Sequence, residues 1–185
     1  MGGPRTGTVG RHLRYAGRVD SELIRIVDAA LAEAGRKSGT WLVCRRGCCD
    51  CCLGPFEITM LDARRLRLGF AALGERDAAR ARAVRSRAER WSGGDDEPCP
   101  ALDPATGACE LYEARPMICR VFGPAVRDGD SVSACELCYQ GATAEEVAAC
   151  AVVVDPEGLE GKLTPAGSTT VAATLREECA ENPKS

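Results

Sequence analysis

Apolar residues recur at helical spacing in the segment that precedes the first cysteines. Between Val19 and Ala34 they fall three or four positions apart, which places them on one face of a helix. Asp20 or Ser21 supplies a start signal and Gly35 a stop signal. We therefore predict an amphipathic helix over this segment, with an apolar face made of Leu23, Val27, Ala30, Leu31 and Ala34.

Two more helices are predicted in the middle of the chain. Thr59 and Asp62 have the spacing of a capping box, in which each side chain satisfies an amide at the helix start. This helix is expected to run to Leu73. Asp77 then opens a second helical run with Ala81, Val84, Ala88 and Trp91 on one stripe.

The second half of the chain carries weaker signals. Thr143 and Glu146 form another capping box, which predicts a short helix through Ala149. Residues 168–178 are expected to form a last helix, and the segment before Thr143 is expected to contain a polar loop. Around residues 99–112, two short apolar stretches flank a turn, which predicts a small hairpin with Cys99 and Cys109 at the same end.

These elements predict a helix-dominated α+β fold. We expect residues 1–18 to be a flexible basic tail and residues 19–180 to form a single cysteine-cluster metal-binding domain. The chain has only 2 Trp, 3 Tyr and 3 Phe, so its core buries little area per side chain and needs extra staples. The expected domain is therefore small and metal-stabilised, with a short β-hairpin and an irregular cysteine-rich centre.

The cysteines change this picture most. The chain has 12 of them, and five lie in the stretch CRRGCCDCC at residues 44–52. No apolar run of the length of a secretory leader or a membrane span is present, so we expect a cytoplasmic protein that does not enter a membrane. Thiols stay reduced in a cytosol, which makes metal ligands more plausible than disulfides.

The spacing of the cysteines suits a metal site. The chain has a single histidine, His12, in the expected tail, so a metal would depend on sulfur. CxxC pairs begin at Cys48, Cys49 and Cys135, and such pairs let a turning backbone offer two thiolates to one centre. Cys150, like Cys179, is interpreted as a small buried hydrophobic residue.

Four chemistries remain open for the dense stretch: a disulfide knot, a zinc site, an iron or iron–sulfur site, and a redox-active thiol pair. The spacing from Cys44 through Cys48 to Cys51 also matches radical S-adenosylmethionine enzymes. Those enzymes place an aromatic residue where this chain has Asp50, and they need a partial barrel that the chain does not predict.

Three segments together resemble a known family. They read CRRGCCDCCLGPFEITMLDARRL, then CPALDPATGACELYEARPMICRVFGP, then CELC. The joint pattern, over roughly residues 40–150, is similar to the CxxCxxCC cysteine-cluster family (YkgJ-like), described as zinc- or iron-chelating proteins. Its relative flagellin lysine N-methylase is associated with an iron–sulfur cluster, so the resemblance implies iron, as an iron–sulfur cluster, ahead of zinc.

The resemblance also implies a ligand set. The family's first cysteine falls at Arg45, so that either Cys44 takes its role or the additional Cys49 does. Cys135 or Cys138 closes the set. The candidate metal ligands are Cys44, Cys48, Cys51, Cys52, Cys99, Cys109, Cys119, Cys135 and Cys138.

The charges of the chain suggest partners. Residues 1–90 carry a net charge of +8 and residues 91–185 a net charge of −11. The two halves either neutralise each other or offer a surface to a protein partner. The Arg-rich run over residues 77–91 lacks interleaved aromatics for base stacking, so a solvated helix face is favoured over a nucleic-acid site. Four arginines lie beside cysteines and would offset thiolate charge: Arg45, Arg46, Arg115 and Arg120.

The sequence thus predicts a module that chelates iron or zinc through converging thiolates. An iron–sulfur enzyme of methylase-like or redox type is one alternative, although no nucleotide loop or catalytic histidine supports it. A zinc-stabilised structural or interaction module is the other. A catalytic centre should leave an open coordination position and a cleft, whereas a structural zinc site should be closed by four ligands.

Overall fold

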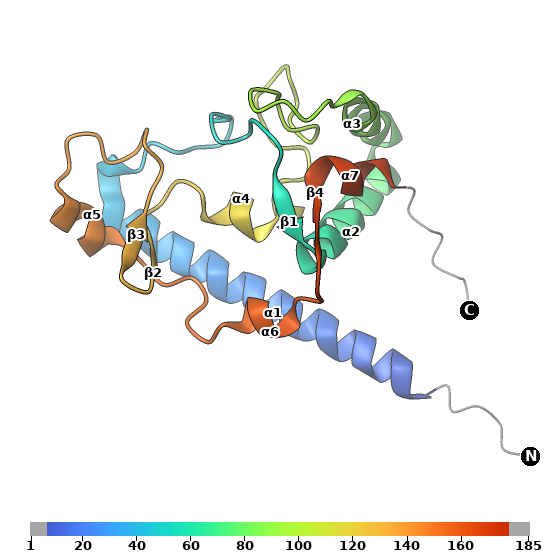
Figure 1. The fold of residues 1–185 in the computed structure, drawn as a ribbon, viewed down its shortest axis with the longest axis horizontal. Coiled ribbons are helices and arrows are strands. Elements are labelled where there is room, and N and C mark those ends of the chain that lie inside the picture. The colour runs from blue at the N-terminus through green and yellow to red at the C-terminus, as the bar shows by residue number, and fades with distance from the viewer. Residues whose placement is uncertain (1–6, 178–185) are drawn as a thin grey trace, which may run out of the picture. The chain divides into compact units, whose positions relative to one another are not determined.

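The protein has the helix-dominated α+β fold that the sequence predicts (Figure 1). The computed structural model describes residues 7–177, with side chains from residue 20 onward. About half of the chain is helical, and its described strands form two small antiparallel sheets. The backbone groups into unit 1, Met1–Val43 with Gly123–Thr164, and unit 2, Cys44–Phe122 with Pro165–Ser185. No described helix combines the length and the apolar character that crossing a membrane requires.

Unit 1 is built on the long helix α1, Gly7–Ser38, followed by the 3-10 turn η1, Gly39–Trp41. The predicted helix over residues 19–34 lies within α1, and its apolar positions Leu23, Val27 and Ala34 are fully buried. Residues 1–6 of the predicted tail lie outside the described residues. The remaining elements of unit 1 are β2 Val126–Asp128, β3 Ser131–Ser133, α5 Ala144–Cys150 and α6 Leu159–Leu163.

The strands β2 and β3 form an antiparallel hairpin where the sequence predicted a polar loop. Val126 pairs with Ser133 and Asp128 with Ser131, which leaves a two-residue connection. Its first residue, Gly129, has φ of 55°, a left-handed conformation that glycine adopts without strain. The dipeptide Gly-Asp of this connection is a hairpin signal that the loop prediction missed.

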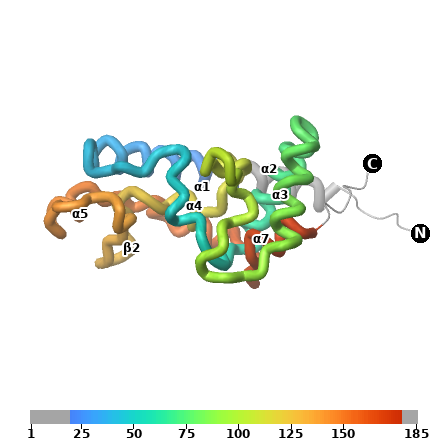
Figure 2. The backbone as a smooth tube through the Cα atoms, turned by 90° about the horizontal axis from the view of Figure 1, so that it is seen from above, coloured from blue at the N-terminus to red at the C-terminus, as the bar shows by residue number. Residues whose placement is uncertain are grey.

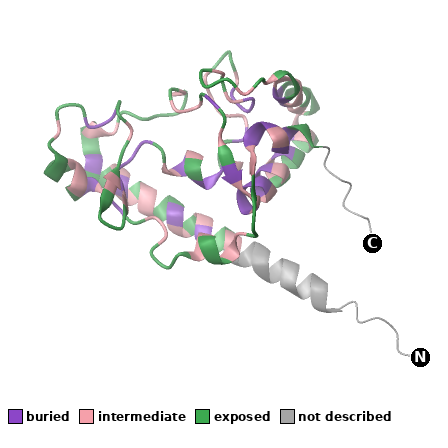
Figure 3. Cartoon of the chain, in the orientation of Figure 1, coloured by how far each residue is buried: buried purple, intermediate pink, exposed green. Residues whose placement is uncertain are grey.

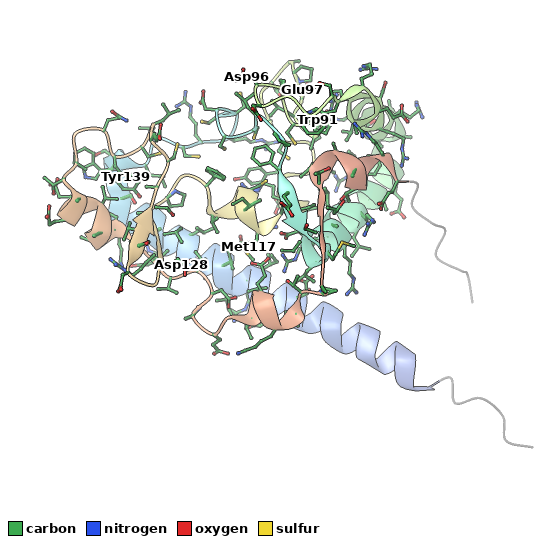
Figure 4. All side chains as sticks on the ribbon, viewed as in Figure 1. Trp91, Asp96, Glu97, Met117, Asp128 and Tyr139 are labelled. Carbon is green, nitrogen blue, oxygen red and sulfur yellow. The ribbon has the colours of Figure 1, made fainter. Side chains whose placement is uncertain are left out.

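Buried hydrogen bonds fix the core of unit 1 around Tyr139 (Figure 4). Its hydroxyl oxygen accepts a hydrogen bond from the Ala125 amide at 2.9 Å and lies 2.6 Å from Ser38 Oγ. Ser38 Oγ in turn donates to the carbonyl of Ala34. Tyr139 itself has φ of 59°, the one positive value among the described residues other than glycine. Because the hydroxyl pairs with two groups, the polar tip is satisfied inside an apolar cluster.

Unit 2 contains three helices that pack against one another, α2 Met60–Arg76, α3 Ala78–Arg90 and α7 Val171–Arg176 (Figure 2). Strand β1, Glu57–Thr59, pairs antiparallel with β4, Ser168–Thr170. Residues 168–170 are therefore a strand, Val171–Arg176 of the predicted last helix are helical, and residue 178 lies outside the described residues. The 3-10 turn η2, Tyr112–Ala114, and the short helix α4, Met117–Val121, complete the unit.

The core of unit 2 lies between these helices, where Figure 3 shows buried residues on α2 and α7. Leu66 and Phe70 of α2 pack in one cluster with Val84 of α3 and Leu175 of α7. The cluster also includes Cys99 and Cys109 at its margin. The apolar core therefore continues directly into the cysteine-bearing loops.

Candidate metal centre

The first cysteine segment is a series of tight turns. The Cys48 amide donates to the Arg45 carbonyl at 2.9 Å, and the Cys52 amide donates to the Cys49 carbonyl at 2.8 Å. Gly47 and Gly54 have φ of 90° and 93°, which the turns require. Such a backbone aims neighbouring side chains in different directions, so a CxxC spacing can present both thiols to one space.

Backbone pairing brings the second cysteine segment against the first. The Cys99 amide donates to the Cys52 carbonyl at 2.8 Å, and the Gly54 amide donates to the Glu97 carbonyl at 2.9 Å. Gly107 also lies against the first segment, because a Cβ there would come 2.9 Å from the Gly47 carbonyl oxygen. The two segments are thus fixed side by side although some 50 residues separate them along the chain.

The predicted hairpin around residues 99–112 is present, but its paired part is short. Leu102 and Cys109 form an isolated antiparallel bridge, and Asp103 and Ala108 are joined by a 2.9 Å backbone hydrogen bond. The pairing is too short to count as two strands, because the tight turn through Gly107 uses most of the segment. It still folds Cys109 back toward Cys99.

A buried carboxylate positions the third cysteine segment. Thr59 Oγ1 accepts from the Asp62 amide, as the capping box predicts, but the Asp62 side chain does not complete the box. Its Oδ1 instead accepts from Arg65 at 2.7 Å and from the amide of Met117, labelled in Figure 4, at 2.9 Å. Since Met117 begins α4, this carboxylate anchors the helix that carries Cys119 to α2.

Thiols from all three segments line one cavity of about 150 Å³. Three arginines and the rings of Phe56, Tyr112 and Phe122 also line it. None of the lining residues is an Asp, a Glu or a His. The cysteines on its wall are Cys44, Cys48, Cys51, Cys52, Cys99, Cys109 and Cys119.

The deepest thiols lie close to one another. Burial is the main reason that the pKa of the Cys119 thiol rises to about 12. Cys99, Cys109 and Cys51 are near enough to raise this pKa as well. Burial likewise raises the pKa of Cys99 to about 11, and the neighbouring Cys109 adds to the effect. In the metal-free protein these thiols therefore keep their protons at neutral pH.

The thiols of the first segment are held by local hydrogen bonds. Cys48 Sγ donates to the Asp50 carboxylate at 3.3 Å, and this bond raises the pKa of Cys48. A hydrogen bond with Cys52 is the first cause of the raised pKa of Cys51, and burial is the second. Both bonds are made by the protonated thiol, so a metal ion would have to displace a proton from each.

The donor set fits zinc or iron. Soft thiolates bind zinc, iron and iron–sulfur clusters, whereas calcium and magnesium need oxygen ligands that are absent from the cavity wall. As placed, no three Cys, His, Asp or Glu side chains of the described residues form a group that could hold a single metal ion. The cavity is of the size that holds a small molecule such as benzene, so its thiols surround a space larger than one ion.

The predicted ligands lie in different surroundings. Cys44 lines the cavity, whereas Cys49 lines a separate groove with Arg87, Trp91 and Glu97. Cys135 and Cys138 belong to unit 1, so their role as ligands stays a prediction. Free thiols, and not disulfides, are present at Cys48, Cys51, Cys99, Cys109 and Cys119.

The predicted arginines also divide into two kinds. Arg45, Arg46 and Arg115 line the cavity. Arg120 is buried and donates to the carbonyls of Glu113 and Arg115, so it shapes the loop before α4. Sequence reasoning missed the role of Asp62, because the capping-box pattern accounts for the same residue in another way.

One comparison with known proteins gives a match. A family model named CxxCxxCC, described as "Putative zinc- or iron-chelating domain", matches residues 43–146. No curated protein and no solved structure matches the chain. The matched range includes every cysteine that lines the cavity.

Proposed function

The chain belongs to the CxxCxxCC family of zinc- or iron-chelating domains, and from this premise we propose that unit 2 binds iron as an iron–sulfur cluster through cysteine thiolates. The observation that carries the proposal is that seven cysteines from three segments line one cavity. The innermost set is Cys51, Cys99, Cys109 and Cys119, whose thiols influence one another electrostatically. Four cysteines suffice for such a cluster.

The size of the cavity favours a cluster over a single zinc ion. A structural zinc site is closed by four ligands about 2.3 Å from the metal when all are thiolates, which demands tightly converging sulfurs. The cysteines here line a cavity of about 150 Å³. A cluster with several metal and sulfide atoms suits that space better, and when bound it would supply electron-transfer or Lewis-acid chemistry.

Metal analysis tests the proposal directly. The full-length protein should be purified without oxygen and assayed for iron, zinc and acid-labile sulfide, and its visible spectrum recorded. We expect iron and sulfide in matching amounts and a brown colour. A colourless protein with stoichiometric zinc would identify the site as a zinc centre, and a protein that takes up neither metal would overturn the proposal.

Proton release gives a second, independent readout. Because the pKa values of Cys99 and Cys119 are raised to about 11 and about 12, both thiols must lose a proton to become ligands near neutral pH. Zinc added as a probe to the metal-free protein in weak buffer should therefore release protons, and metal retention should fall as the pH falls. Metal binding without proton release would argue against thiolate coordination.

A further inference from the structure

Three guanidinium groups lie on the wall of the cavity without a carboxylate among its lining residues. Arg45, Arg46 and Arg115 are its only lining residues with a permanent charge. Arg45 and Arg46 are exposed, and Arg115 is partly buried. The permanent charges of the lining residues are therefore all positive, while the Asp50 carboxylate lies beside one of these residues, Cys48.

Some arginines elsewhere in unit 2 pair with acids. Glu110 accepts from Arg87 at 2.8 Å and lies 3.3 Å from Arg80, and Glu177 pairs with Arg67 at 2.6 Å. Among the described residues, Arg45 and Arg46 have no such carboxylate partner. What distinguishes the cavity is that it gathers three such cations on one wall.

Arg115 is held in place by contacts that leave its end available. Its Nε donates to the Tyr112 carbonyl at 2.8 Å, and its guanidinium lies 3.5 Å from the centre of the Tyr112 ring. Within the described part of the chain, its terminal nitrogens make no hydrogen bond. A guanidinium fixed in this way is pre-organised to bind an anion through its two terminal nitrogens.

A metal centre with four thiolates would not neutralise all three arginines. Four thiolates around a doubly charged centre leave a net charge of about −2, against three arginines. At least one guanidinium therefore remains for another anion. The rings of Tyr112 and Phe122, each 40 % exposed, lie on the same wall and leave the cavity accessible to solvent.

We propose that this cavity binds a small oxyanion, a carboxylate or a phosphate, through Arg45, Arg46 and Arg115 beside the metal centre. The inference rests on the proposed function, because the anion would share the cavity with that centre. Guanidinium forks match the oxygens of both groups, so the residues define the oxyanion class and not its carrier. An anion at this position would place its oxygens next to the metal, which would make the centre a ligand-binding site and not only a structural one.

Calorimetric titration with inorganic phosphate and with acetate tests the inference. Both should be titrated into the protein as isolated and into the metal-free protein, at constant ionic strength, because screening weakens exposed charge pairs. We expect saturable binding at one site per chain by at least one of them. The tighter of the two anions identifies the preferred group.

Variants then identify the residues. Arg45→Gln, Arg46→Gln and Arg115→Gln should each raise the dissociation constant about tenfold. Arg82→Gln removes the same charge from an exposed position on α3 outside the cavity, and should leave the constant unchanged. Equal weakening by Arg82→Gln would show a nonspecific charge effect and would overturn the inference.

Metal content separates this inference from the proposed function. The cavity variants should keep their metal while they lose the anion. Loss of metal in these variants, or absence of anion binding to a metal-loaded protein, would mean that the arginines only offset the charge of the centre. The inference would then fall and the proposed function would stand. If the protein bound the anion but took up no metal, the proposed function would fall and the anion site would stand.

Discussion

The two units use cysteine in different ways. In unit 1, Cys138 and Cys150 are 4 % and 7 % exposed and pack with Ala125 and Tyr139 in an apolar cluster. Cys150 Sγ has one weak polar contact, with the Lys37 carbonyl at 3.5 Å. Cys150 thus packs as a small hydrophobic side chain, as predicted, while the ligand role of Cys138 stays a prediction.

In unit 2, seven of the described cysteines line one cavity at the edge of the core. Cys99 and Cys109 contact the apolar cluster while their thiols lie close to each other and to Cys119. The cysteines of the two units therefore differ in surroundings that their spacing in the sequence does not reveal. The backbone turns some thiols toward other thiols and packs others against carbon.

Among the variants considered, cysteine substitutions should have the largest effect, and the effect should differ between the two units. Cys109→Ser removes a thiol from the cavity, so we expect metal content to fall to a small fraction and thermal stability to fall with it. Cys150→Ser in unit 1 should keep its metal. Within the first segment, Cys49→Ser is a matched control, since Cys49 lines a separate groove. Metal loss in Cys49→Ser would show that the ligand set differs from the cavity wall.

Each unit also contains an acid–arginine pair, and the loss of these pairs should affect stability to different extents. Asp62 and Arg65 in α2 are an i,i+3 pair with side chains only 2 % and 7 % exposed. Asp62→Ala leaves a buried guanidinium and the Met117 amide without this acceptor, and should lower the free energy of unfolding by about 3–5 kcal/mol. Because α4 also loses its anchor, metal content should fall in parallel.

The matched pair in unit 1 is Glu33 with Arg36, also at i,i+3 but exposed to solvent. Glu33→Ala should change stability little, because exposed pairs contribute little. Urea denaturation of both variants checks the two expectations together. Equal effects would mean that burial is not what separates the two pairs.

A close helix approach in unit 2 gives the next largest effect. A Cβ on Gly69 would lie 2.2 Å from the Cβ of Ala114, so Gly69→Ala should push η2 away from α2 and cost about 1–3 kcal/mol. The double variant Gly69→Ala with Ala114→Gly should recover most of the loss. In unit 1, Gly161→Ala meets nothing within 4 Å and should not destabilise the protein. Thermal denaturation distinguishes these outcomes, and a failure of the double variant to recover would place the clash elsewhere.

Local patterns in the sequence predicted local structure well. Thr143 and Glu146 form both halves of the predicted capping box, and Asp77 caps α3. Long-range pairings were not predictable in the same way. Nothing in the sequence near residue 57 indicates that β1 pairs with β4 at residues 168–170, because two three-residue strands carry too little periodicity.

The candidate site shows the same limit. The family pattern indicated which segments hold the thiols, but Cys44 and Cys49 could not be ranked from spacing. Their separation follows from the direction of tight turns and from the approach of Gly107 to Gly47, which are three-dimensional features. Asp62 had a sufficient local role as a capping residue, so its link to Met117 was hidden.

The smallest expected effect comes from a substitution in unit 1, which does not contain the cavity. Tyr139→Phe removes the hydroxyl that accepts from the buried Ala125 amide and pairs with Ser38, so stability should fall by about 1–2 kcal/mol. Metal content should stay unchanged, because the cavity lies wholly in unit 2. Tyr112→Phe is the matched control: its ring is 40 % exposed, and its loss of a hydroxyl should cost little. Hydrogen exchange at Ala125 should increase in Tyr139→Phe alone. Loss of metal in Tyr139→Phe would contradict the expectation that metal binding depends on unit 2 alone.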